Sequence, residues 1–101
     1  MPDPDPTTKL PLSNVTVVEL GNLIAGPFTG LMLGDLGADV IKIERPGTGD
    51  MIRQSGDSGE AIFTAFNRNK RSVKIDLQSD AGRAAYRELV SEADIVIENL
   101  R

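Results

Sequence analysis

A glutamate and an arginine, Glu44 and Arg45, follow a run of β-branched residues and precede a turn rich in Pro and Gly. At this position in a nucleotide-binding sheet, an acidic side chain binds a ribose hydroxyl, and an arginine accommodates a phosphate on the ribose. Arg45 therefore suits an adenosine with an extra phosphate, as in NADP or coenzyme A. A solvent-exposed arginine without a ligand is the alternative interpretation.

Two glycines, Gly21 and Gly26, flank an earlier turn, but the middle glycine of the dinucleotide-binding motif is missing. This turn either favours an anion through N–H groups at a helix N-terminus or is only a tight connection. The carboxylates form no evident catalytic pair, and nothing in the sequence has the context of an activated nucleophile. The charge of Asp35 is unfavourable near the C-terminus of a predicted helix, which suggests either a salt bridge or a partner.

Four basic residues lie within seven positions of one another: Arg68, Lys70, Arg71 and Lys74. This cluster precedes a predicted strand, whereas ligands of parallel sheets bind after the strands. We therefore expect the cluster at the edge opposite the ligand, with a role in surface, subunit or helix C-terminus contacts.

Alternating strands and helices must position these residues. Strands are predicted at 15–20, 40–44, 72–77 and 94–98, and helices at 26–37 and 79–92. Residues 51–60 are predicted to form an exposed loop, and 61–67 a short helical turn. The pattern predicts an α/β fold, a Rossmann-like parallel sheet with flanking helices. Gly26, Gly30 and Gly34 share one helix face and should let that helix approach the sheet closely.

The chain has 101 residues, a formal net charge of -4, and neither cysteine nor histidine. This length suits one small domain, and the acidic balance argues against a nucleic-acid partner. Without cysteine there is no disulfide and no thiol nucleophile, and no metal site is predicted. The apolar run 23–36 is too short to span a bilayer. The N-terminus lacks the features of a signal peptide, so we expect a cytoplasmic protein that does not enter membranes.

Several ordered blocks resemble the N-terminal part of the class III CoA-transferases, the CaiB/BaiF type that includes formyl-CoA transferase and carnitine CoA-transferase. The matching blocks are Val18–Gly21, Ala25–Pro27, Leu33–Pro46, Gly49–Asp50 with Arg53, Phe63, Phe66–Val73, Asp76–Leu77, and Ala93–Asp94 with Glu98–Arg101. The resemblance implies an enzyme that moves CoA between an acyl-CoA and a carboxylic acid, with CoA as a substrate and no prosthetic group. It also implies much longer chains that form an interlocked homodimer.

The resemblance further implies that the nucleophilic aspartate lies beyond the end of this sequence. None of the 101 residues is then catalytic, and the chain alone should be inactive. Contacts with CoA are carried over to the first turn, to an arginine near the adenosine phosphate, to a segment beside the adenine, and to the start of a further loop. These residues are Ile24, Ala25, Arg45, Ile75, Asp76, Leu77, Gln78, Asn99, Leu100 and Arg101. Gln78 stands where some members have lysine, and Leu100 where phenylalanine is common.

Alternative functions stay open. The α-methylacyl-CoA racemases of the same family tend to shorten the region between Asp50 and Lys70, which this sequence keeps long, so a transferase is favoured. A non-catalytic nucleotide-binding or interaction domain is the other alternative. Residues 1–11, rich in Pro and Asp, are predicted to be a disordered leader. Residues 12–101 are predicted to form a partial CoA-binding domain, truncated after the fourth strand.

Overall fold

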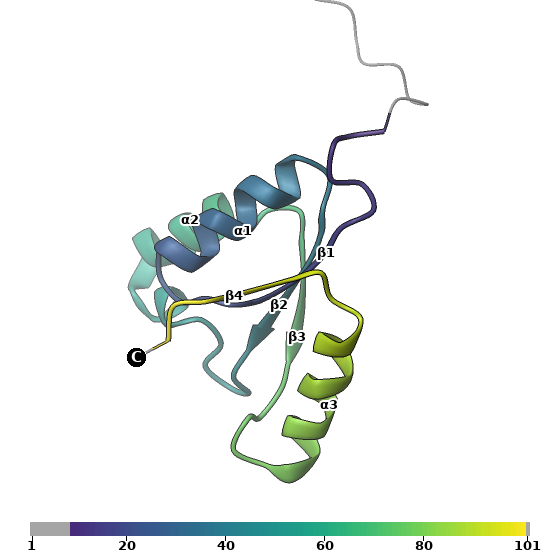
Figure 1. Ribbon diagram of the computed structural model, residues 1–101. Helices are drawn as coiled ribbons and strands as arrows, with labels where there is room; N and C mark the ends of the chain where they lie inside the picture. The colour runs from purple at the N-terminus through teal and green to yellow at the C-terminus, as the bar shows by residue number, and fades with distance from the viewer. Residues whose placement is uncertain (1–8, 101) are drawn as a thin grey trace, which may run out of the picture.

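A computed structural model describes residues 9–100 of the chain, in which strands and helices alternate. The elements are β1 (Thr16–Leu20), α1 (Ala25–Asp35), β2 (Asp39–Glu44), the 3₁₀-helix η1 (Met51–Gln54), α2 (Gly56–Phe66), β3 (Lys70–Lys74), α3 (Asp80–Ser91) and β4 (Ile95–Glu98). The strands form one parallel sheet in the order β3-β2-β1-β4 (Figure 1). The chain proceeds outward from β1 to β3 and then returns to the other side of β1, so the strand order reverses between β1 and β4. The predicted Rossmann-like α/β fold is confirmed.

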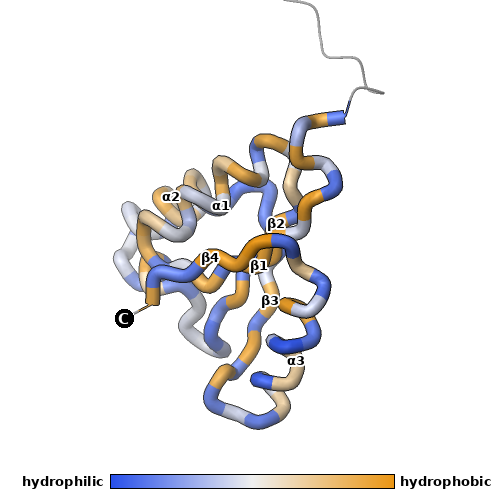
Figure 2. Tube along the Cα trace, in the orientation of Figure 1, coloured by the Kyte–Doolittle hydropathy of each residue, from blue (hydrophilic) through white to orange (hydrophobic). Residues whose placement is uncertain are grey.

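Helices α1 and α2 lie on one face of the sheet and α3 lies on the other (Figure 1). Successive side chains of a strand point to opposite faces, so each strand contributes to two cores. The core beneath α3 contains Val18, Leu20, Ile43 and Ile75, against which Tyr86, Leu89 and Val90 pack. The core beneath α1 contains Val17, Ala38 and Val40, with Leu33 packed against it. Figure 2 shows β4 as a hydrophobic stretch along the sheet.

The glycines of α1 bring this helix close to the sheet, as predicted. A Cβ added to Gly26 would lie 2.7 Å from the Cα of Gly21, and one added to Gly30 would overlap the carboxylate of Glu19. At Gly34 the added Cβ would be 3.6 Å from Val40 Cγ2, an ordinary contact. The approach is therefore closest at the N-terminal half of the helix.

The loop predicted for residues 51–60 was wrong, whereas the helical structure predicted for 61–67 is confirmed as the second half of α2. The expected exposed loop forms η1 and the first turns of α2, which begins at Gly56, not at residue 61. The N-terminus of α2 lacks the usual helix-start features. Gly56 has a φ of +70°, and the N-cap Ser55 makes no side-chain capping bond. Tertiary contacts compensate: the Arg53 guanidinium lies 3.5 Å from the centre of the Phe63 ring.

Strand β3 occupies residues 70–74 where 72–77 was predicted, because its pairing with residues 40–44 of β2 sets its limits. The predicted start of α3 is confirmed, since Ser79 Oγ accepts a hydrogen bond of 2.9 Å from the Gly82 N–H. Residues 1–8 of the predicted leader lie outside the described residues. Leu12 donates a backbone hydrogen bond of 2.9 Å to Leu36. Within residues 9–100, no helix combines the length and apolar character needed to cross a membrane.

Candidate functional site

A cleft of about 470 Å³ lies over the carboxyl ends of the strands. Its floor is apolar, formed by the buried side chains of Leu20, Ile43 and Ile75. Its rim carries the exposed Arg45 and Gln78. Residues after all four strands line the cleft, so it reaches the point where the strand order reverses. Open α/β sheets bind their ligands at this point.

The structure brings most of the predicted contact residues together here. Six of them line the cleft: Arg45, Ile75, Asp76, Leu77, Gln78 and Leu100. Ile24 and Ala25 are exposed at the start of α1 and do not belong to its lining. Asn99 lies beside the first turn, and Arg101 falls outside the described residues.

Arg45 and Glu44 are separated by the alternation of the strand. Glu44 is 3% exposed and points toward η1, whereas Arg45 is exposed at the cleft. Among residues 9–100, no carboxylate forms an ion pair with Arg45. Both residues line the cleft, but the Arg45 guanidinium is available to an anion, whereas the Glu44 carboxylate already accepts hydrogen bonds from Asp50, Arg53 and Ser72.

Glu44 accepts four hydrogen bonds. Oε1 accepts from the Asp50 N–H at 2.9 Å and from Arg53 Nε at 2.8 Å, and Oε2 accepts from Arg53 Nη2 and Ser72 Oγ. Burial alone would raise the pKa of Glu44, but the bonds from Arg53, Ser72 and Asp50 outweigh it and lower the pKa from 4.5 to about 2. The hydrogen bond with Glu44 in turn raises the pKa of Arg53. These contacts fix the segment after β2, and with it the position of Arg45.

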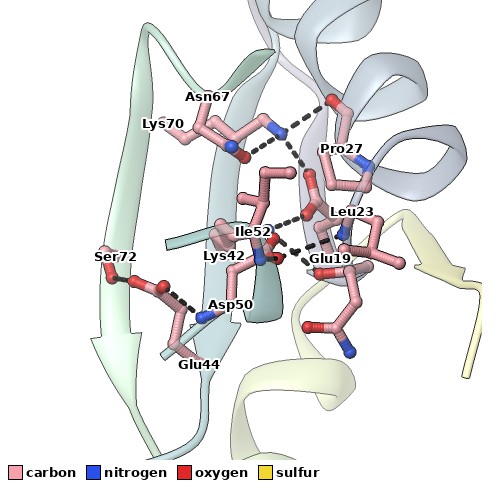
Figure 3. Close-up of polar contacts among 12 residues, drawn as sticks. Glu19, Leu23, Pro27, Lys42, Glu44, Asp50, Ile52, Asn67, Lys70 and Ser72 are labelled. Atoms are coloured by element: carbon pink, nitrogen blue, oxygen red, sulfur yellow. Dashed lines mark hydrogen bonds and ion pairs between the residues drawn. The ribbon is translucent and has the colours of Figure 1, made fainter. Parts of the chain in front are cut away.

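Four charged residues form a buried cluster between the sheet and α1: Glu19, Lys42, Asp50 and Lys70 (Figure 3). Lys42 Nζ lies 2.8 Å from both Glu19 Oε2 and Asp50 Oδ2. The contact with Asp50 Oδ2 lacks hydrogen-bond geometry and is therefore electrostatic. Two acids and two bases balance the charge, as burial of ions requires.

Lys70 does not make the surface, subunit or helix C-terminus contacts predicted for its cluster, because it is buried. Its side chain is 2% exposed, and Nζ contacts Glu19 Oε1, the Pro27 carbonyl and Asn67 Oδ1. Burial lowers the pKa of Lys70, and Glu19 partly offsets this. The buried cluster was missed, although one sequence signal existed: Glu19 and Lys42 interrupt two apolar strands with opposite charges.

The other basic residues of that region behave as expected. Arg68 pairs with Asp35 at 2.8 Å and Arg71 pairs with Asp39 at 2.7 Å, both at the surface. The salt bridge predicted for Asp35 is thereby confirmed. In the described part of the chain, no group of acidic side chains could hold a metal ion.

The first turn, residues 21–23 between β1 and α1, is held by side chains from other elements. Lys42 Nζ donates to the Gly21 carbonyl at 3.0 Å, and Asp50 Oδ1 accepts from the Leu23 N–H at 3.1 Å. The Asn99 side chain accepts from the Asn22 N–H at 2.8 Å and donates to its carbonyl at 3.0 Å. Leu23 has a φ of +64°. This conformation costs a non-glycine residue on the order of 1–3 kcal/mol and persists only where its surroundings enforce it.

Comparison with known proteins agrees with this architecture. The sequence profile of CoA-transferase family III matches residues 12–101. The chain belongs to CoA-transferase family III. A succinate–glutarate CoA-transferase of Agrobacterium fabrum is 46% identical over 106 residues, which cover 95% of this chain and 26% of that protein. A succinyl-CoA:glutarate CoA-transferase of Mus musculus is 38% identical over 102 residues, covering 97% of this chain and 23% of its own length.

Solved structures of the family share the fold. A CaiB/BaiF family protein from Brucella suis superposes with a TM-score of 0.85 at 48% identity, covering 92% of this chain and 26% of that one. The hypothetical protein Rv3272 of Mycobacterium tuberculosis gives a TM-score of 0.79 at 38% identity, with coverage of 86% and 24%. The chain therefore spans about a quarter of the length of the relatives that it matches.

Proposed function

We propose that this chain forms one wall of the CoA site in a CoA-transferase, which moves CoA between an acyl-CoA and a carboxylic acid. The observation that carries the proposal is the cleft at the carboxyl ends of the strands, in a chain that belongs to CoA-transferase family III. The reacting centre lies outside these residues. This chain supplies binding and orientation.

The cleft has the chemistry that the adenosine end of CoA requires. Leu20, Ile43 and Ile75 offer an apolar surface for the adenine, and Gln78 offers a polar group to its edge. Arg45 supplies the cation for the 3′-phosphate, because guanidinium binds phosphate with paired hydrogen bonds. The exposed Ile24 and Ala25, which follow the first turn at the start of α1, extend the site toward the rest of the ligand.

Two further features of the whole protein belong to this proposal. The relatives described above are named for succinate or succinyl-CoA, so a short dicarboxylic acid is the proposed acyl group. The whole protein is proposed to be a cytoplasmic homodimer. Exposed apolar side chains support burial against further protein: Phe28 is 46%, Met32 53% and Val96 42% exposed.

The Arg45 assignment is tested by comparing CoA with dephospho-CoA, which lacks the 3′-phosphate. In the full chain that the gene encodes, Arg45→Ala should weaken CoA binding about five- to tenfold, or about 1–1.5 kcal/mol. It should leave dephospho-CoA binding nearly unchanged. Calorimetry with both ligands measures this, and Arg87→Ala, which removes an exposed arginine outside the cleft lining, is the control. Equal losses for the two ligands would refute the phosphate contact.

Transfer is separated from racemisation by the fate of the substrate. A transferase incubated with succinyl-CoA and glutarate should produce glutaryl-CoA, which mass spectrometry detects. A racemase would instead exchange the α-hydrogen of a 2-methylacyl-CoA with deuterium from D₂O and transfer no CoA. The second result would replace the proposed reaction while keeping the CoA site.

A further inference from the structure

The first turn, residues 21–23, is fixed by side chains that reach it from distant parts of the chain. Lys42 comes from β2, Asp50 from the segment before η1, and Asn99 from the end of β4. Each binds a backbone group of a different residue in the turn. A simple tight connection needs no such support, because its own backbone bonds close it.

Asp50 joins this turn to the segment that carries Arg45. Its Oδ1 accepts from the N–H groups of Leu23, at 3.1 Å, and Ile52, at 3.0 Å, and its own N–H donates to Glu44. Asp50 is 1% exposed, so no ligand touches it directly. Its contacts place the left-handed Leu23, and the exposed Ile24 and Ala25 that follow, relative to the cleft.

We infer that Asp50 is a positioning residue for ligand binding: by holding the Leu23 N–H, it sets the first turn in the orientation that meets CoA. The inference rests on the proposed function, because it takes CoA as the ligand. It goes further because Asp50 is buried and is not among the proposed CoA contacts. Asp50 would nevertheless determine how tightly the site binds CoA. Asp50 acts on the ligand through the turn, and its negative charge forms an ion pair with Lys42.

Two substitutions separate the hydrogen bonds of Asp50 from its charge. Asp50→Asn keeps an oxygen that accepts from the Leu23 and Ile52 N–H groups, but it removes the negative charge beside Lys42 and places an amide NH2 there, which lowers stability. Asp50→Ala removes both. Val40→Ala is the stability control. Val40 is fully buried beneath α1, and none of the hydrogen bonds that hold the first turn involves it.

The full chain that the gene encodes should be used, with CoA affinity measured by calorimetry well below the unfolding temperature of each variant. We expect all three variants to unfold at lower temperature. Asp50→Ala should raise the Kd for CoA at least tenfold, while Asp50→Asn and Val40→Ala should stay within about threefold of the wild type. Amide hydrogen exchange should accelerate in a peptide covering residues 21–28 of Asp50→Ala and remain slow in Asp50→Asn.

The outcomes are distinguishable. Wild-type affinity in Asp50→Ala, or equal losses in the Ala and Asn variants, would overturn the positioning role while leaving the proposed function intact. A loss in Val40→Ala as large as in Asp50→Ala would show that general destabilisation is the cause, and would also overturn it. A wild-type protein that does not bind CoA would overturn the proposed function and this inference together.

Discussion

Glu44→Gln should change how the stability of the fold depends on pH. The Glu44 pKa is about 2 in the folded chain against 4.5 for an unperturbed glutamate, because hydrogen bonds from Arg53, Ser72 and Asp50 outweigh the effect of burial. Each pKa unit corresponds to about 1.36 kcal/mol, so ionised Glu44 stabilises the fold by about 3 kcal/mol. The Glu44 side chain is 2% exposed but Arg53 is 42% exposed, so solvent screens this pair in part and about 3 kcal/mol is the upper end of the contribution.

The direction follows from the lowered pKa. The stabilisation of the fold by Glu44 is complete above pH 4.5, where the carboxylate is ionised in both the folded and the unfolded chain. It is lost progressively as the pH falls from 4.5 toward 2, because the unfolded chain binds the proton first. The amide introduced by Glu44→Gln does not titrate in this range. The free energy of unfolding of this variant should therefore vary less with pH there.

Urea unfolding followed by circular dichroism from pH 7 to pH 2 measures this difference. The wild type should be up to about 3 kcal/mol more stable than Glu44→Gln at pH 7, and the two should converge near pH 2. Glu88→Gln, which removes an exposed carboxylate on α3, is the matched control and should follow the wild-type curve. Parallel stability curves for the wild type and Glu44→Gln would refute the argument. They would show that ionisation of the Glu44 carboxyl group does not stabilise the folded chain.

Two other perturbations test the packing beneath α1. Lys42→Met leaves Glu19 and Asp50 buried without their shared cation and should lower the free energy of unfolding by about 3–5 kcal/mol, measured by urea titration at pH 7. A loss below about 1 kcal/mol would contradict this account of the cluster. Gly30→Ala should destabilise by about 1–3 kcal/mol because its Cβ would overlap the Glu19 carboxylate, whereas Gly34→Ala has room and should stabilise by about 0.5–1 kcal/mol. Thermal unfolding of the pair checks this, and equal effects would rule out the close approach as the cause.

Local sequence was sufficient for the strand–helix alternation and for the edge of the sheet at which the cleft lies. Runs of β-branched residues mark strands, and the carboxyl ends of parallel strands meet at one edge whatever the details of the loops. Arg45 could therefore be placed at this edge from the local pattern, whereas Ile75 and Gln78 were assigned to the site only through the family resemblance. The spacing of the glycines in α1 likewise predicted its close approach to the sheet.

The buried charges and the first turn were decided by tertiary structure. A lysine beside a predicted strand is normally exposed, and Lys70 becomes buried only because Glu19, Asn67 and the Pro27 carbonyl converge on it. The left-handed Leu23 has no sequence signal, because leucine adopts this conformation only under constraint from its surroundings. Local pattern thus determined that strands and helices alternate and that Arg45 follows a strand at the carboxyl edge of the sheet, although it placed β3 at 72–77 and not at 70–74. Contacts between segments far apart in the chain decided how the turn beside that edge is held, because no short stretch of sequence contains both partners.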